Sequence, residues 1–231
     1  MTLPSVTVVV PAFNEHDNLP AVLGALTSYF ADRGGEVEVL VVDDGSSDGS
    51  GAFLADWARR TPSGRVLTHP HNRGLTAALR TGFYGADKEL VTWVPADGQI
   101  LATELGKVLD AWNGHDLVLS TYRHRPDGAV RLLMSRALRI LLRLTIGLGD
   151  RLEGPYLFRR DFLERTELVA RTSAGTIGFE IAAKIRAAGL RITSTEIECE
   201  QRLSGQSKVA NARNILATLD ELRRIRASMR R

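Results

Sequence analysis

Apolar runs rich in β-branched residues alternate with stretches of helical spacing through the first half of the chain, and this alternation constrains the fold most. VTVVVPAF, EVEVLVVDD and ELVTWVPAD have the character of buried strands, the first of which we expect to end at Pro11. Residues 18–34, 74–86 and 102–113 between them have helical spacing. Continuous apolar strands separated by helices predict an α/β fold, with a mostly parallel sheet covered on both faces.

Three polar loops follow these strands: PAFNE (11–15), DDGSSDGS (43–50) and PADGQ (95–99). In parallel sheets ligands bind beyond the carboxyl ends of the strands, so we expect the three loops to form one site. The glycine patterns that cradle phosphates in dinucleotide-binding folds and in P-loops are absent from the sequence. The loops therefore predict an acidic nucleotide site, in which carboxylates meet ribose hydroxyls, base N–H groups or a metal ion.

Length and composition favour an ordinary globular protein of 231 residues without a linker or an internal repeat. The single cysteine, Cys199, excludes an internal disulfide and a site made of cysteines alone. No apolar run approaches the length of a membrane span, and the N-terminal residues lack the basic start of a signal peptide. We therefore expect a cytoplasmic protein.

Charge is distributed unequally between the two halves of the chain. Residues 1–120 carry 8 basic and 15 acidic side chains, whereas residues 121–231 carry 22 and 12. The basic half is suited to a phosphorylated substrate, an anionic membrane or a nucleic acid. Nucleic acid is the weakest of these candidates, because the arginines are not interleaved with aromatic residues and no recognition motif is present.

The ordered set of motifs resembles family 2 of the glycosyltransferases, which have the Rossmann-like GT-A fold, and within it the dolichol- or polyprenyl-phosphate sugar synthases. The matching pieces are VVVPAFNE, VVDDGSSDGS, HNRGLTAALRTGF, PADGQ, STYR, DRLEGPYLFRR, GFEIAAKIRAAGLRI and QRLSGQSKV. They cover about residues 5–210. The resemblance implies a GT-A domain over 1–210, with a donor half (1–122) and an acceptor half (123–210), followed by a basic amphipathic helix over 211–231.

The resemblance also implies which residues hold a GDP- or UDP-sugar. Pro11 and Ala12 would line the base, Glu15 would lie near the ribose, and Asp43 or Asp44 would accept hydrogen bonds from the base. A solvated turn is the other interpretation of the Asp/Ser run. The full set expected at the nucleotide-sugar is Pro11, Ala12, Asn14, Glu15, Asp43, Asp44, Asn72, Gly74, Ala96 and Arg123.

The expected metal motif differs from that of the family. The synthases usually carry Asp-Ala-Asp-x-Gln, whereas this chain has Pro95 in place of the first acid and keeps Asp97 and Gln99. Mg²⁺ is commonly held by one or two carboxylates together with substrate phosphates and waters, so one acid can suffice. We expect Mg²⁺ or Mn²⁺ at Asp97 and Gln99, with metal-independent turnover and loss of activity as the alternatives.

The acceptor half contributes the remaining candidates. Arg202 and Lys208 match the family's basic loop and are expected, with Asp97, to act in catalysis by meeting the phosphates. A phosphate acceptor needs no general base, whereas a hydroxyl acceptor does. Asp150, Glu153 and Glu180 are the base candidates, although a structural role for Glu180 at its helix is favoured. The resemblance implies inverting transfer of a sugar from the nucleotide-sugar to a polyprenyl or dolichyl phosphate. The alternatives are a soluble family 2 glycosyltransferase with a hydroxyl acceptor in natural-product or cell-wall biosynthesis, and a catalytically weak nucleotide-binding protein.

Two basic amphipathic helices are expected in this half. Residues 131–147 combine apolar residues with the arginine stripe Arg131, Arg136, Arg139 and Arg143. Such a helix lies in a membrane interface or packs on its own domain. The C-terminal helix is expected to dock on the domain, on lipid or on a partner.

Overall fold

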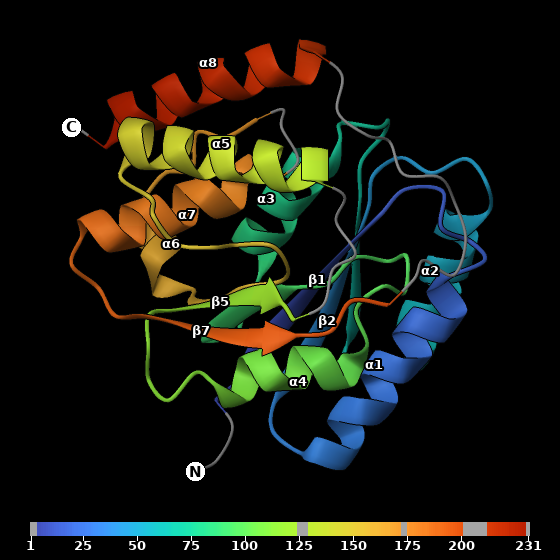
Figure 1. Cartoon of the computed structure of the whole chain (residues 1–231). Coiled ribbons are helices and arrows are strands. Elements are labelled where there is room, and N and C mark those ends of the chain that lie inside the picture. The colour runs from blue at the N-terminus through green and yellow to red at the C-terminus, as the bar shows by residue number, and fades with distance from the viewer. Residues whose placement is uncertain (1–3, 124–128, 172–174, 201–211, 230–231) are drawn as a thin grey trace.

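One seven-stranded sheet forms the centre of the molecule (Figure 1). The computed structural model describes residues 4–123, 129–171, 175–200 and 212–229. In helix α5 the side chains are described from residue 135 onward, and in helix α8 from residue 218 onward. The strand order is β3-β2-β1-β4-β6-β5-β7, and only β6 runs against the others. The strands are β1 (Val6–Ala12), β2 (Val37–Asp43), β3 (Gly64–Thr68), β4 (Leu90–Trp93), β5 (Leu117–Tyr122), β6 (Leu157–Arg159) and β7 (Ile192–Ile197). The mostly parallel sheet is confirmed.

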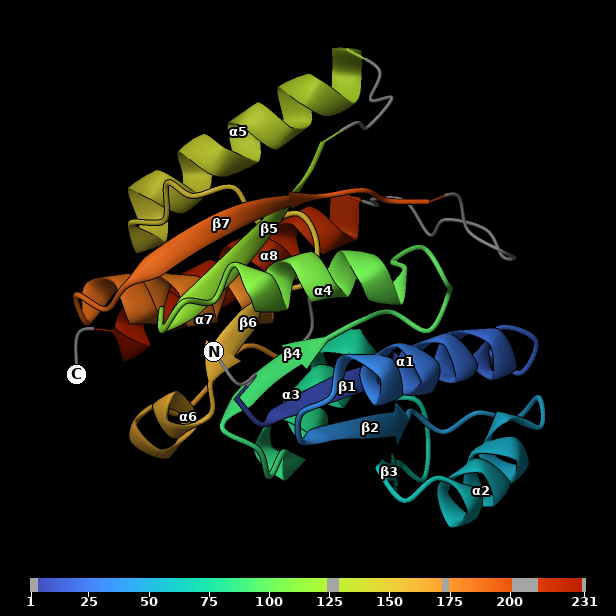
Figure 2. The ribbon, with the colours of Figure 1, turned by 90° about the horizontal axis from the view of Figure 1, so that it is seen from below.

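Helices cover both faces of this sheet, as Figure 2 shows from below. They are α1 (Leu19–Arg33), α2 (Ser50–Arg60), α3 (Leu75–Gly85), α4 (Ala102–Asp110), α5 (Ala129–Ile146), α6 (Asp161–Arg165), α7 (Thr176–Ala187) and α8 (Ala212–Ser228). Val8 and Val10 share one core with α1 and α4, whereas Val9 shares the other with α3, α5, α7 and α8. Since successive strand residues point to opposite faces, one β-branched run supplies both cores.

The prediction that the first strand ends at Pro11 is wrong, because β1 continues to Ala12 and Pro11 pairs in register with Val42. Strand residues two apart face the same neighbour, and Val9 faces β4, since its carbonyl accepts from the N–H of Val94. Pro11 faces the same side. There β4 has already ended, because its last residue, Trp93, pairs with Val9. Its missing N–H therefore costs no ladder bond.

The second half departs from the simple alternation of parallel strands and helices. β6 is three residues long and inserts between β4 and β5, pairing antiparallel with both. A strand this short carries no periodicity that sequence analysis could detect. Its insertion leaves β5 parallel to β4 and β7, so both halves of the expected domain share one sheet.

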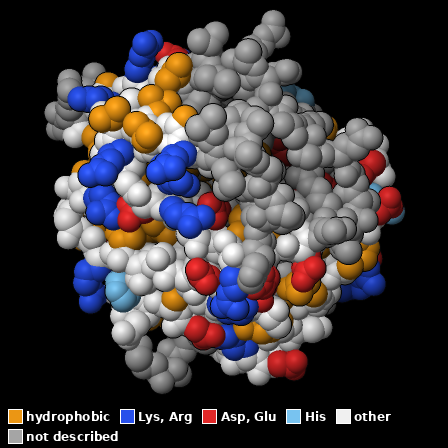
Figure 3. All heavy atoms as spheres, in the orientation of Figure 1, with side chains coloured by type: hydrophobic (Ala, Val, Ile, Leu, Met, Phe, Trp, Pro, Cys, Tyr) orange, Lys and Arg blue, Asp and Glu red, His pale blue; other side chains and the backbone are white. Residues whose placement is uncertain are grey.

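The two basic helices dock on the domain. α5 buries Leu142 and Ile146, and α8 buries Leu222 and Ile225 in the same core. α5 also leaves Ile140 and Leu144 exposed, by 57% and 72%, on the side that carries exposed arginines. In Figure 3 basic side chains surround a hydrophobic area over the C-terminal ends of α5 and α8. None of the helices in the described part combines the length and hydropathy needed to cross a membrane.

Candidate active site

The loops that follow β1, β2 and β4 meet at one edge of the sheet, and we call residues 13–18, 44–50 and 94–101 the donor loops. The strands are parallel, with Ala12 of β1 in register with Asp43 of β2, and Asp43 in register with Thr68 of β3. Val94 still pairs with Val9 through its N–H. The carboxyl ends of the strands therefore bring together loops that lie far apart in the sequence, as predicted.

The first two donor loops are joined by hydrogen bonds. The N–H of Asn14 donates to Ser46 Oγ at 3.0 Å, and Asn14 Oδ1 accepts from the N–H of Ser47 at 2.9 Å. The N–H of Glu15 donates to Ser50 Oγ at 3.2 Å. Asn14 has a φ of +55°, a left-handed conformation that asparagine tolerates better than most residues. The Asp/Ser run is thus a loop held against PAFNE and not an isolated solvated turn.

Asp43 and Asp44 are both buried but have different partners. Asp43 Oδ1 accepts from the N–H of Ser46 at 3.0 Å, which closes the turn after β2. Asp44 accepts from the N–H of Arg73 at 3.0 Å and from that of Gly74 at 2.7 Å. Asp44 therefore fixes the loop before α3, and this loop includes the predicted residues Asn72 and Gly74.

His69 is part of this arrangement, and sequence analysis did not identify it. Its Nδ1 lies 2.6 Å from Asp44 Oδ1, and its Nε2 lies 2.9 Å from Thr81 Oγ1 in α3. Only 5% of His69 is exposed. In the sequence His69 lies between Thr68 and Pro70, and neither neighbour indicates that it is buried, so only the tertiary contact identifies it.

Asp97 is buried at the start of the third donor loop, and its Oδ1 accepts from the N–H of Gln99 at 3.1 Å. Gly98 between them has a φ of +75°. Gln99 also pairs with Glu200 through both backbone and side chain, so the loop is attached to the segment after β7. Ala96, 3% exposed, packs in the same core as Ala12.

The metal motif supplies only part of a coordination sphere. Among the described residues, no group of three or more His, Cys, Asp or Glu side chains could hold a metal ion. Asp97 offers one carboxylate, which suits a divalent cation that takes its other ligands from a diphosphate and from water. The residues therefore fit Mg²⁺ or Mn²⁺ as a group shared with the substrate.

The candidates in the acceptor half occupy different positions. Arg123, at the end of β5, lies 3.4 Å from Glu196 and 3.8 Å from Glu198. Asp150 forms a two-pronged ion pair with Arg186 at 2.8 and 2.6 Å. Asp150 is thus occupied by Arg186, whereas the Arg123 side chain is 53% exposed beside two acids.

Glu153 and Glu180 hold backbone segments in place. Glu153 accepts from the N–H of Tyr122 at 3.1 Å, next to the end of β5. Glu180 is fully buried, accepts from the N–H groups of Val169 and Ala170 at 2.8 Å each, and pairs with Lys184 at 2.7 Å. These contacts support the structural role favoured for Glu180. The predicted catalytic residues Arg202 and Lys208 lie outside the described residues.

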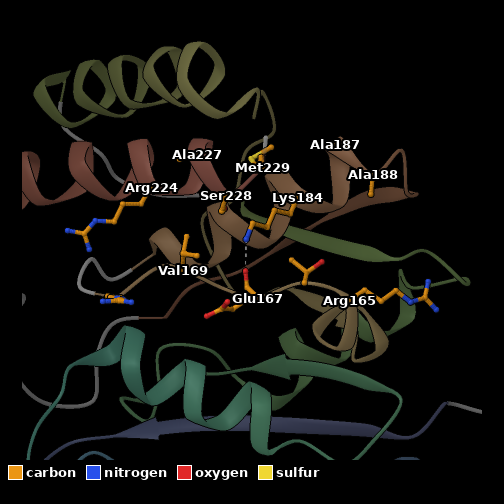
Figure 4. Close-up of a pocket in the computed structure, with 12 residues that line it drawn as sticks. Arg165, Glu167, Val169, Lys184, Ala187, Ala188, Arg224, Ala227, Ser228 and Met229 are labelled. Carbon is orange, nitrogen blue, oxygen red and sulfur yellow. Dashed lines mark hydrogen bonds between the residues drawn. The ribbon is translucent and has the colours of Figure 1, made fainter. Parts of the chain in front are cut away.

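A cavity of about 820 Å³ lies between α6, α7 and the end of α8 (Figure 4). Lys184 Nζ donates across it to the carbonyl of Glu167 at 2.6 Å. α6 follows the antiparallel β6, and α7 ends where β7 begins, so this cavity lies at the sheet edge opposite the donor loops. None of the described residues predicted for the site lines it.

Comparisons with known proteins identify the family to which the chain is similar. A family model described as "Glycosyl transferase family 2" matches residues 7–183. Polyprenol monophosphomannose synthase of Mycolicibacterium smegmatis is 32% identical over 220 residues, which cover 89% of this chain and 81% of that protein. Undecaprenyl-phosphate mannosyltransferase of Micrococcus luteus is 33% identical over 218 residues, with 89% and 87% covered.

A solved structure shares the fold. Glucosyl-3-phosphoglycerate synthase from Mycobacterium tuberculosis, in complex with Mn²⁺, UDP and phosphoglyceric acid, superposes with a TM-score of 0.69. The match covers 95% of this chain and 78% of the other, at 22% sequence identity. At this identity the likeness shows the fold alone.

Proposed function

The chain belongs to glycosyl transferase family 2, and we propose that it transfers a sugar from a GDP- or UDP-sugar to a polyprenyl or dolichyl phosphate, with inversion at the anomeric carbon. The observation that carries this proposal is the meeting of three polar donor loops at one sheet edge. Two relatives at 32% and 33% identity are named for mannosyl transfer to polyprenol or undecaprenyl phosphate. Mannose is accordingly the sugar we propose.

The donor nucleotide is proposed to lie across the first two donor loops. Pro11 and Ala12 would line the base, and Glu15 would lie near the ribose. The contacts of Asp44 with Arg73 and Gly74 support a role in shaping the pocket, so Asp43 is the better candidate for the base N–H. Asn14 would hold the two loops in register, as its bonds to Ser46 and Ser47 suggest.

The donor diphosphate is proposed to lie next to Asp97. A divalent cation held there would offset the charge that develops on the leaving diphosphate. Arg202 and Lys208 are proposed to act on the same charge by hydrogen bonding and Coulomb attraction. Gln99, attached to Glu200, would keep the third donor loop in position.

A phosphate acceptor fits the acidic groups that the structure describes. A phosphate monoester has a second pKa near 6 and is a nucleophile at neutral pH, so no protein base is required. Asp150 and Glu180 are each paired with a basic side chain, which occupies the carboxylate. The structural roles of these residues therefore support the lipid-phosphate acceptor over a hydroxyl acceptor.

The membrane surface is the proposed location of this acceptor. On α5, Arg136, Ile140, Arg143 and Leu144 lie at helical intervals on the exposed side. An exposed face that mixes apolar and cationic residues suits the headgroup region of an anionic membrane. We propose peripheral association through this face, on the cytoplasmic side.

Two measurements test this function. The first is a thermal-shift screen of GDP- and UDP-sugars with and without Mn²⁺. One donor should raise the melting temperature of the protein, because a ligand that binds the native state stabilises that state. Transfer of labelled mannose to polyprenyl phosphate in vesicles should then be lowered at least about 100-fold by Asp97→Asn, a change of about 2.7 kcal/mol in the barrier.

The outcomes separate the alternatives. Donor binding without transfer to any lipid or hydroxyl acceptor would leave a nucleotide-binding protein. Transfer to a soluble hydroxyl acceptor but not to lipid phosphate would show that the acceptor is a hydroxyl compound and not the proposed lipid phosphate. Vesicle co-sedimentation that is unchanged in an Arg136→Gln/Arg143→Gln variant would remove the proposed role of α5.

A further inference from the structure

A second cavity, of about 540 Å³, lies between α3 and the segment before α7. Three arginines line it, Arg73, Arg80 and Arg171, and we call it the three-arginine groove. The other described residues of its lining are Ala77, Thr81, Tyr84 and Ala170. Among the described residues, this lining contains no carboxylate and none of the residues predicted for the candidate active site, although Arg73 lies between the predicted Asn72 and Gly74. The groove therefore lies beside that site and is lined by other side chains.

Separate contacts position the three arginines, at the backbone for Arg73 and Arg171 and at the side chain for Arg80. The backbone N–H of Arg73 is bound by Asp44, and that of Arg171 by Glu221 of α8 at 2.5 Å. Arg80 is held through its side chain, which donates to the carbonyl of Leu168 and lies over the ring of Tyr84 with its Cζ 5.5 Å from the ring centroid. The backbone at Arg73 and Arg171 is therefore fixed, and of the three guanidinium groups that of Arg80 is held by contacts of its own.

The positive charge of the groove is only weakly compensated. Among the described residues, the ion pair that reaches these three guanidinium groups joins Arg80 to Glu167, at 3.7 Å and with the Glu167 side chain 82% exposed. Arg171 also lines the cavity of Figure 4, where two other cations have close acidic partners. Lys184 pairs with Glu180 at 2.7 Å and Arg224 with Asp220 at 2.5 Å. The arginines of the groove thus have weaker acidic partners than Lys184 and Arg224.

We propose that the three-arginine groove binds a phosphate group at a site separate from the donor diphosphate. Guanidinium groups match phosphate oxygens through paired hydrogen bonds, and Arg is preferred where such planar recognition is needed. Tyr84 accepts from the N–H of Leu168 at 3.0 Å, which leaves its own O–H as a further donor. The phosphate belongs either to an anionic lipid headgroup or to a soluble phosphorylated molecule.

The test measures phosphate binding while the donor site is filled. Calorimetric titration with inorganic phosphate, in the presence of Mn²⁺ and saturating GDP or UDP, gives the soluble arm. Flotation with phosphatidylcholine vesicles, with and without phosphatidic acid, gives the lipid arm. Arg73→Gln and Arg171→Gln each remove one guanidinium group but keep the backbone N–H, and each should weaken binding about tenfold or more.

Arg60→Gln is the matched control, because Arg60 is an exposed arginine of α2 whose partner is Asp56. The Arg60→Gln protein should bind phosphate with the same affinity as the unmodified protein. If Arg171→Gln weakens binding to vesicles that contain phosphatidic acid, the ligand is a lipid headgroup. If Arg171→Gln weakens only the binding of inorganic phosphate, the ligand is a soluble phosphorylated molecule. The proposal is overturned if neither probe binds, if GDP or UDP displaces phosphate, or if the three variants bind equally. Donor turnover, measured separately, reports on the proposed function independently of these results.

Discussion

Nδ1 of His69 lies 2.6 Å from a carboxylate oxygen of Asp44, and only 5% and 3% of these two residues are exposed. The contact joins the end of β3 to the loop after β2. The same carboxylate holds the N–H groups of Arg73 and Gly74, so the start of α3 is fixed to the donor loops as well. The buried carboxylate of Asp44 thus holds the loop before α3 against the loop after β2, where we propose that the nucleotide binds.

Asp44→Asn should lower the free energy of unfolding by about 2–3 kcal/mol, because buried donors lose an anionic acceptor. Urea denaturation at neutral pH measures this change. Asp17→Asn, at a carboxylate whose side chain is 91% exposed, is the control and should have little effect. An Asp44→Asn protein as stable as the unmodified one would contradict the structural role.

Glu180→Gln should destabilise the protein by about 3–5 kcal/mol, since Lys184 would keep a charge without its buried partner. The turnover number of the folded fraction should change little. The opposite pattern, full stability with turnover lowered by orders of magnitude, would identify Glu180 as a general base. Glu167→Gln, at an exposed acid of the same region, is the matched control for unfolding.

Pro95→Asp should increase the affinity for Mn²⁺ about tenfold, because a second carboxylate would join Asp97 at the end of β4. Pro95→Asn, which makes a similar change in size without the charge, should not. Titration of Mn²⁺ followed by electron paramagnetic resonance measures the difference. Weaker binding by the aspartate variant would count against Asp97 as a metal ligand.

Asp48 predicts a pH dependence of stability. Burial alone would raise the pKa of Asp48, but hydrogen bonds from the Ser50 hydroxyl and from the N–H groups of His16 and Ser50 lower that pKa below its usual 3.8. The ionised form is favoured in the folded state, so its contribution is present above about pH 4 and is lost as pH falls through the lowered pKa.

Comparison with Asp48→Asn isolates this contribution. The difference in unfolding free energy between the two proteins should be constant from neutral pH down to about pH 5 and should shrink at lower pH. Urea denaturation at several pH values measures it. A difference that grows on acidification would show that the pKa of Asp48 is raised.

Pro11 and β6 show where local pattern failed to predict the fold. Proline normally ends a central strand, yet β1 continues through Pro11, because the neighbour on that side stops first. β6 pairs antiparallel between two parallel strands, and its three residues are too few to show alternation. Both features depend on strands that are distant in sequence.

The sequence by itself determined the parallel sheet, the covering helices and the three loops at its carboxyl edge, because apolar periodicity and turn residues act over short stretches of chain. Only the tertiary structure decided which acids have structural roles. Asp44 meets His69 25 residues away, Glu180 meets Val169 11 residues away, and Glu221 meets Arg171 50 residues away. A carboxylate's role depends on the donors that packing brings to it, and residue type and spacing along the chain do not contain that information.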